Sequence, residues 1–434
     1  MTWGTSILWP KAILHIDGDS FFAACEVAKK PHLKGKPVVT GQERGIVSAA
    51  TYEAKALGVK RGMSLSEVRR LYPEVIFLPS DFETYHLFSR RMYEIVRRYT
   101  PAVEEYSIDE CFADLGGMQR VNKMSYEKMA ERIKYELELE LGITFSVGLA
   151  PTKVLAKIGS KWQKPSGLTL IPMIEANNFL IKTPIESVWG IGGSTAAFLS
   201  KYQIRTAQDF VNLSQGWVEQ NLAKPIVEVW RELRGQAVYK VDAAGRQSYQ
   251  SLSKTKTFTP PSTDFDYVFS QLSRNIENAC LKARSWNLVT ETIFFFLKTQ
   301  DFKYHGCEIK LPYPTAVPQE IISAIKPYYQ KIFRDNVRYR ATGVTLMKLQ
   351  SGLETQLDLF GAVTKSEGLT KIFSSVDEIS ARYGRHTVFL GSSLLAKNER
   401  KWGSEAKEPA KNNDLFKGGM PKRRLNIPML GEIG

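Results

Sequence analysis

The sequence predicts an α+β protein of several domains, and three observations support this. Between residues 11 and 170, short apolar segments typical of strands alternate with amphipathic helical segments, which indicates a mixed or antiparallel sheet covered by helices. Residues 184–234 contain only short helical segments, and residues 252–349 follow the order β-α-β-β-α-β. At 434 residues the chain is too long for one core, so roughly two to four domains are expected.

The first motif with chemical content is a short strand that ends in a carboxylate. Residues 13–17 predict the strand, Asp17 closes it, and residues 20–29 predict a helix. An Asp in this position is most often only a helix cap.

Apolar segments at 36–39 and 45–48, with a Gly-rich turn between them, predict a hairpin farther along the chain.

The second motif is Asp109-Glu110, an adjacent pair of carboxylates in the predicted hairpin 106–115. Two neighbouring carboxylates repel each other unless a cation lies between them, and Mg²⁺ is a common solution. A lone Asp-Glu pair is more often a solvated turn than a metal site. Asp17 supplies a third carboxylate, and the two motifs together make a metal site the stronger interpretation.

Other expected elements are strands at 75–78 and 144–150 and helices at 81–98, 126–141 and 151–158.

The segments Asp17–Glu26 and Ser107–Glu110 resemble the two catalytic motifs of the Y-family translesion DNA polymerases. The resemblance extends in pieces over most of residues 11–360 and implies a right-hand polymerase fold. The implied parts are a palm (1–20 and 75–168), small fingers (21–74), a helical thumb (169–240), a β-α-β-β-α-β little finger (241–349) and a flexible C-terminal tail (350–434).

This resemblance also implies a reaction, which is template-directed, low-fidelity DNA synthesis across lesions. A primer 3′-hydroxyl would attack the α-phosphate of a dNTP with the help of two Mg²⁺ ions. Asp17, Asp109 and Glu110 are the implied catalytic residues and metal ligands, and the backbone carbonyl of Gly18 is an implied further ligand.

Five side chains match positions that contact the nucleotide in this family. Phe22 matches the steric gate that excludes a 2′-hydroxyl, and its neighbour Phe21 is assigned to the same pocket, although it also suits the core. Tyr52, Lys55 and Lys164 match residues that contact the triphosphate. Lys55 stands where many members have Arg, which keeps the charge but loses the bidentate fork. The alternatives are a core aromatic at Phe22, an ordinary amphipathic helix at Tyr52 and Lys55, and a surface lysine at Lys164.

Two segments are candidate DNA contacts. The turn Gly190-Ile191-Gly192 resembles a helix-hairpin-helix motif, whose backbone N–H groups hold phosphate without reading sequence. Lys254 and Lys256 occupy alternate positions of a predicted strand and therefore share one face. A plain helix-connecting turn and a solvated strand remain the alternatives. The net charge of +14 favours a nucleic-acid partner, here primer-template DNA.

The polar tail contains Gln356-Leu357-Asp358-Leu359-Phe360, which resembles the pentapeptide that binds the bacterial sliding clamp. Four dispersed cysteines without metal-ligand spacing indicate reduced thiols and a cytoplasmic protein. The densest apolar stretch, 293–297, is too short for a membrane span, so no membrane partner is expected. We expect a monomer.

Two other classes of function remain open at this stage. One is a non-catalytic DNA-binding scaffold with the same fold, against which the intact carboxylates argue. The other is a different two-metal nucleotidyl transferase or cyclase on a similar palm, against which the DNA-gripping parts argue. The branch within the family also stays open, because Lys164-Pro165-Ser166-Gly167 resembles polymerase IV whereas Lys55 and the tail resemble polymerase V.

Overall fold

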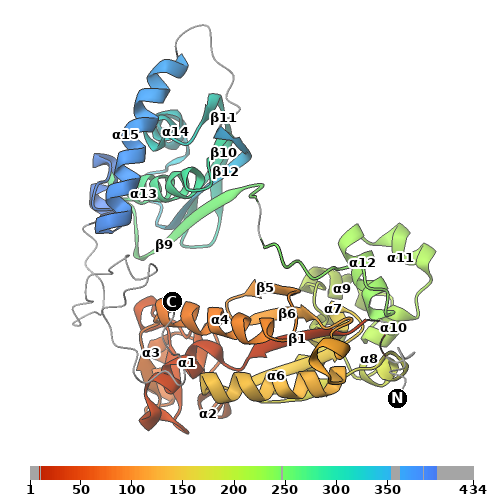
Figure 1. Cartoon of the computed structure of the whole chain (residues 1–434). Helices are drawn as coiled ribbons and strands as arrows, with labels where there is room; N and C mark the ends of the chain where they lie inside the picture. The colour runs from red at the N-terminus through yellow and green to blue at the C-terminus, as the bar shows by residue number, and fades with distance from the viewer. Residues whose placement is uncertain (1–8, 10, 246–247, 353–361, 385, 398–434) are drawn as a thin grey trace. The chain divides into compact units, whose positions relative to one another are not determined.

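The computed structural model describes residues 9, 11–245, 248–352, 362–384 and 386–397. The chain divides between Gly245 and Arg246 into two compact units (Figure 1). The helices of the first unit are α1 (Phe21–Lys29), α2 (Tyr52–Ala56), α3 (Leu65–Leu71), α4 (Phe82–Arg97), α5 (Gln119–Asn122), α6 (Tyr126–Leu141), α7 (Lys153–Trp162), α8 (Ala176–Leu180), α9 (Gly193–Ser200), α10 (Ala207–Val211), α11 (Gln215–Asn221) and α12 (Lys224–Leu233).

A five-stranded mixed sheet organises the first unit. In spatial order its strands are β5 (Val103–Ser107), β6 (Glu110–Asp114), β1 (Ile13–Gly18), β7 (Phe145–Ala150) and β8 (Leu168–Leu170). The central strand β1 pairs antiparallel with β6 and β7, while β7 pairs parallel with β8. The mixed sheet predicted for this region is therefore confirmed.

Helices cover both faces of this sheet (Figure 1). Leu14 and Ile16 of β1 are buried with apolar residues of α4 and α6 on one face. The alternate residue Ile13 is buried with residues of α7 on the other face. Because successive residues of a strand point to opposite faces, His15 and Asp17 share the face of Ile13 and α7. This alternation decides which helix neighbours the candidate site.

A smaller sheet lies in the predicted fingers, with the order β3 (Ala49–Ala50), β2 (Val38–Thr40), β4 (Ile76–Leu78). The strand predicted at 45–48 is wrong, because the second hairpin strand begins only at Ala49. Gly41 and Gly45 both adopt positive φ, 111° and 71°, and the residues between them form a 3₁₀ turn. A side chain at Gly41 would meet the carbonyl oxygen of Ile46 at 2.2 Å, so only glycine allows this turn.

The short helices α8 to α12 pack on α7 in one continuous core. Leu199, Phe210 and Trp230 from these helices are buried in the same cluster as Leu155 of α7. The predicted thumb region therefore shares a core with the helix that covers the candidate site. None of the helices in the described part of the chain is long and apolar enough to cross a membrane.

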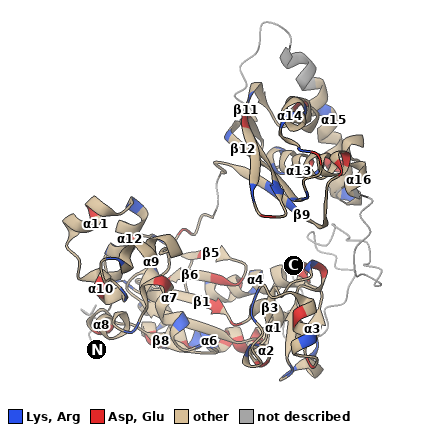
Figure 2. Ribbon diagram, turned by 180° about the vertical axis from the view of Figure 1, so that it is seen from behind, with Lys and Arg blue, Asp and Glu red and all other residues tan. Residues whose placement is uncertain are grey.

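The second unit contains a four-stranded antiparallel sheet. Its strands, in spatial order, are β11 (Tyr304–Thr315), β10 (Leu288–Thr299), β12 (Tyr339–Ser351) and β9 (Leu252–Ser262). Two helices, α13 (Phe265–Arg284) and α14 (Pro318–Ile332), complete the predicted β-α-β-β-α-β order. Both helices pack on the sheet face that buries Phe295. Basic residues lie along β9 (Figure 2).

The prediction of a flexible tail from residue 350 is wrong for the part of the tail that the structure describes. Helix α15 (Ala362–Tyr383) is followed by the short helix α16 (Leu394–Lys397). The guanidinium of Arg284 on α13 donates to both carboxylate oxygens of Asp377, each at 2.7 Å. Phe373 is 8% exposed and Ala396 is fully buried. This segment has too few apolar residues for a core of its own, but it is ordered by packing on α13.

Candidate active site

Three carboxylates gather at one end of the central sheet. Asp17 at the end of β1 lies directly opposite Glu110 at the start of β6 in the antiparallel register. Asp109 occupies the turn between β5 and β6, immediately before Glu110. The two sequence motifs, about 90 residues apart, are therefore neighbours because the hairpin pairs with β1.

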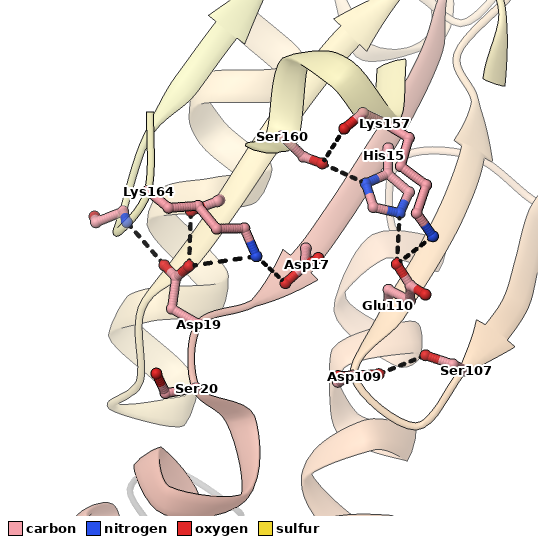
Figure 3. A network of polar contacts seen from close by, with 12 residues as sticks. His15, Asp17, Asp19, Ser20, Ser107, Asp109, Glu110, Lys157, Ser160 and Lys164 are labelled. Carbon is pink, nitrogen blue, oxygen red and sulfur yellow. Dashed lines mark hydrogen bonds and ion pairs between the residues drawn. The ribbon is translucent and has the colours of Figure 1, made fainter. Parts of the chain in front are cut away.

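Two side chains hold Glu110, and both come from the face of the sheet that α7 covers (Figure 3). The Nζ of Lys157 donates to Oε2 of Glu110 at 2.7 Å, and Nε2 of His15 lies 3.1 Å from the same oxygen. Burial alone would raise the pKa of Glu110, but the contacts with His15 and Lys157 lower this pKa to about 2. Full burial lowers the pKa of His15, although its contact with Glu110 favours the charged form.

Asp17 is paired with a different lysine. The ammonium of Lys164 donates to Oδ1 of Asp17, and it lies 3.9 Å from Oδ1 of Asp19 (Figure 3). Burial raises the pKa of Asp17 although the neighbouring Lys164 ammonium favours the charged form. Lys164 therefore lies beside two carboxylates, and its predicted contact with the triphosphate stays a prediction.

Asp109 points to a separate partner, the hydroxyl of Ser107, which donates to its Oδ1 at 2.5 Å (Figure 3). The backbone carbonyl of Asp109 accepts a hydrogen bond from the N–H of Gly18 at 2.8 Å. A Cβ at position 18 would lie 2.7 Å from the ring of Phe21, but at an ordinary 3.4 Å from the carbonyl oxygen of Asp109. Gly18 therefore joins the two motifs through the backbone.

Asp19 is a buried carboxylate that the sequence analysis did not assign. It is 1% exposed and accepts hydrogen bonds from the hydroxyl of Ser146 and the N–H of Ser166, both at 2.8 Å. The hydroxyl of Tyr52 lies 3.4 Å from its Oδ1. Asp19 thus connects a residue of α2 with the turn that follows Lys164. The spacing of Asp17 and Asp19 could have indicated this, because residues two positions apart on a strand point to the same face.

The two adjacent phenylalanines have different surroundings. Phe21 is 3% exposed and belongs to the main core. Phe22 is only partly buried, and its ring stacks on Tyr85 with centroids 4.5 Å apart. Phe82 lies against the same ring, edge to face, at 5.5 Å. Phe21 is therefore a core residue, whereas Phe22 lies at the edge of the core and is partly exposed.

Helix α2 brings its two predicted nucleotide contacts to the same region. The Nζ of Lys55 donates to the hydroxyl of Ser20 at 2.7 Å and lies 4.3 Å from the ring centroid of Tyr52. Partial burial lowers the pKa of Lys55 and raises the pKa of Tyr52. The Lys55–Ser20 contact joins α2 to the turn between β1 and α1.

The candidate DNA contacts lie on a turn before α9 and on the strand β9. Gly190 has φ +93°, and Gly192 caps the N-terminus of α9, but Ile191 between them is only 6% exposed and packs in the core. Lys254 and Lys256 pair with buried Val344 and Thr342, which places both lysines on the face that α13 covers, at the edge strand β9. The segment Gln356–Phe360 lies outside the described residues.

Metal binding needs several oxygen ligands in one place. In the described part of the chain, no group of three or more His, Cys, Asp or Glu side chains stands ready to hold a metal ion. Asp17 instead forms an ion pair with Lys164, and Glu110 forms one with Lys157. The all-oxygen donor set of Asp17, Asp109 and Glu110 nevertheless suits a hard divalent cation, and the paired lysines show that this end of the sheet attracts positive charge.

Comparisons with known proteins identify the family. Residues 16–161 match the impB/mucB/samB family, and residues 249–359 match the C-terminal domain of that family. The chain is 32% identical over 379 residues to a DNA polymerase IV of Desulfatibacillum aliphaticivorans, covering 87% of this chain and 95% of the relative. A solved Y-family DNA polymerase chimera has the same fold, with a TM-score of 0.66, 24% identity and coverage of 78% of this chain and 99% of its own. The chain belongs to the Y family of DNA polymerases.

Further relatives agree with this assignment. A DNA polymerase IV of Moorella thermoacetica is 32% identical over 392 residues, covering 88% of this Y-family polymerase and 96% of the relative. The post-insertion binary complex of Dbh DNA polymerase has a TM-score of 0.53 at 25% identity and covers 78% of this chain and 99% of its own. DNA-directed DNA synthesis across lesions is therefore the function of this polymerase, and its fold is the α+β right-hand polymerase fold that the sequence predicts.

Proposed function

We propose that this Y-family polymerase extends a primer at the end of the central sheet where Asp17, Asp109 and Glu110 lie. The observation that carries the proposal is the register of β1 and β6, which sets Asp17 opposite Glu110 with Asp109 in the adjoining turn. The substrates are primer-template DNA and dNTPs. A scaffold without catalysis would need none of these carboxylates at one place, and a cyclase would need no second, DNA-gripping unit.

Membership of this family implies the use of a divalent metal. We propose two Mg²⁺ ions, with Asp17, Asp109 and Glu110 and the carbonyl of Gly18 as ligands. When bound, the ions would stabilise the charge on the attacking and leaving oxygens of the phosphoryl transfer. Lys164 is paired with Oδ1 of Asp17 and Lys157 with Oε2 of Glu110, so an ion at Asp17 would compete with the Lys164 ammonium.

The other site residues have roles that follow from their charge and position. A nucleotide triphosphate brings its own negative charge, and Lys164 and Lys55 are the nearby cations that would stabilise it. Tyr52 would contact the same phosphates from α2. Phe22, which is partly buried and stacked on Tyr85, would occupy the space that a 2′-hydroxyl needs.

Three further segments are proposed to bind DNA or a clamp. The Gly190–Gly192 turn and the lysines of β9 are proposed phosphate contacts, which position DNA without reading its sequence. The segment Gln356–Phe360 is proposed to bind a sliding clamp, with Leu357, Leu359 and Phe360 as the apolar anchors. A monomer suffices for this activity.

Primer extension by the purified protein tests the proposed function. A labelled primer on a longer template should grow by the templated nucleotide when dNTPs and Mg²⁺ are present, and EDTA should abolish the growth. A primer without template is the control for terminal transfer. Failure to extend any primer-template under these conditions would favour the non-catalytic alternative.

A further inference from the structure

Lys157 on α7 is a buried cation that the sequence analysis did not assign to the site. The residue is 7% exposed, and its Nζ contacts Glu110 at 2.7 Å. The same Nζ lies 4.6 Å from the ring centroid of Tyr106 and 5.2 Å from that of Trp189. Burying an ammonium is costly unless it is paired, and ring faces attract a cation. The aromatic rings and the carboxylate therefore fix this ammonium in one place.

The rings that surround Lys157 are themselves fixed. The indole N–H of Trp189 donates to the hydroxyl of Tyr106 at 3.2 Å, and the two rings meet edge to face. Phe112 is fully buried on β6, and its ring centroid lies 5.5 Å from that of Tyr106 and 5.7 Å from that of Trp189. Lys157 is thus held by an aromatic cage of Tyr106, Phe112 and Trp189, built from the hairpin and from the loop before α9.

The contacts of Glu110 are asymmetric. Lys157 and His15 both contact Oε2, and no residue in the described part of the chain makes a hydrogen bond with Oε1. One oxygen is therefore fixed from two directions, while the other is available as an acceptor. Without Lys157, His15 alone would hold this oxygen, through a single hydrogen bond.

We propose that Lys157 is a positioning residue, which holds the carboxylate of Glu110 in the orientation that the reaction needs. It acts through Glu110 and needs no contact with the primer or the nucleotide. The inference rests on the proposed function, because that function gives Glu110 its role. The aromatic cage explains why a flexible lysine can serve this purpose, since it removes the freedom of the side chain.

Lys153 provides a matched control on the same helix, one turn before Lys157. It is 4% exposed, forms an ion pair with Glu104 and lies 4.9 Å from the ring centroid of Phe112. Its partner is not one of the candidate catalytic carboxylates. A variant at Lys153 therefore removes an equally buried, equally paired cation while leaving Glu110 untouched.

Single-turnover extension of one primer-template with wild type, Lys157→Met and Lys153→Met tests the inference. Loss of a residue that orients a ligand typically costs about 10- to 100-fold in activity, so kcat of Lys157→Met should fall by that factor. The KM for dNTP should stay unchanged, because the nucleotide contacts are separate, and Lys157→Arg should recover part of the rate. Lys153→Met should keep the wild-type kcat. Equal losses in both variants, or an unchanged kcat in Lys157→Met, would overturn the inference.

Thermal unfolding of the metal-free protein gives a readout that is independent of activity. Lys157→Met should lower Tm, because it leaves Glu110 charged and half-buried without its ammonium. In a Glu110→Gln background the same change should have little effect on Tm, and an equal loss in both backgrounds would contradict the pairing. An active Glu110→Gln variant would refute the proposed role of Glu110 itself. An inactive Glu110→Gln with a fully active Lys157→Met would refute only this inference.

Discussion

The ring of Phe22 stacks face to face on Tyr85, with an angle of 10° between the ring planes. Tyr85 is fully buried on α4, and its hydroxyl donates to Glu26 at 3.1 Å. This fixed ring supports Phe22 from one side and keeps it in one orientation. A rigid aromatic wall is what a steric gate against a 2′-hydroxyl requires.

Phe22→Ala should therefore admit ribonucleotides. The variant removes the ring that would collide with the 2′-hydroxyl, so kcat/KM for ribonucleotides should rise while that for deoxynucleotides changes little. The measurement is the ratio of the two kcat/KM values. Phe21→Leu is the control, because it changes the neighbouring core residue without opening the gate. If the ratio is the same in Phe22→Ala and wild type, Phe22 is only a core aromatic.

The packing of α15 leads to a prediction about stability. Asp377→Ala removes the acceptor of a bidentate pair and leaves the partly buried Arg284 without its carboxylate. We expect the free energy of unfolding of the second unit to fall by about 1–3 kcal/mol. Denaturant unfolding measures this, and limited proteolysis should cut α15 faster in the variant. Wild-type behaviour in both experiments would show that α15 is not part of the folded unit.

The charge of the chain predicts how it binds DNA. Neutralising phosphates with lysine and arginine releases counterions, so affinity for primer-template should fall steeply with salt and depend little on sequence. Fluorescence anisotropy of a labelled primer-template at several salt concentrations gives the slope. A flat dependence would mean that the net charge of +14 does not serve DNA binding.

The proposed clamp motif predicts a contrast between two assays. Leu359→Ala with Phe360→Ala removes two apolar anchors, each worth on the order of 1–2 kcal/mol. Extension of long templates with the clamp present should fall, whereas clamp-free addition of one nucleotide should be unchanged. A folding defect would lower both activities. A double variant that still responds fully to the clamp would show that the pentapeptide matches by chance.

Local patterns were sufficient to predict much of the fold, including the strand and the hairpin that carry the three carboxylates. Periodicity placed the helix at 126–141 with the bounds that the structure has, and it placed the strand that ends at Asp17. Asp109 and Glu110 were proposed as site residues because the motif at Asp17 accompanies them and both motifs resemble those of a polymerase family. Each of these features depends on residues that are close together in the sequence.

The features that were missed depend on distant segments. Lys157 lies 47 positions from Glu110, and nothing in its own helix shows that α7 crosses the sheet beside the hairpin. The position of His15 on the same strand face as Asp17 could have indicated that it lies near the site. Its partner Ser160, however, comes from α7, which is distant in the sequence. The order of α15 depends on Arg284, which lies 93 positions from Asp377. Tertiary packing, not local propensity, decides these contacts.

The central claim is that the carboxylates at the end of β1 and β6 catalyse primer extension. Asp109→Asn tests it most directly, because the substitution removes one charge while leaving the size of the side chain and the basic surfaces unchanged. Single-turnover extension and DNA affinity should be measured on the same preparation. The account predicts loss of extension with wild-type DNA binding, and extension near the wild-type rate would contradict it.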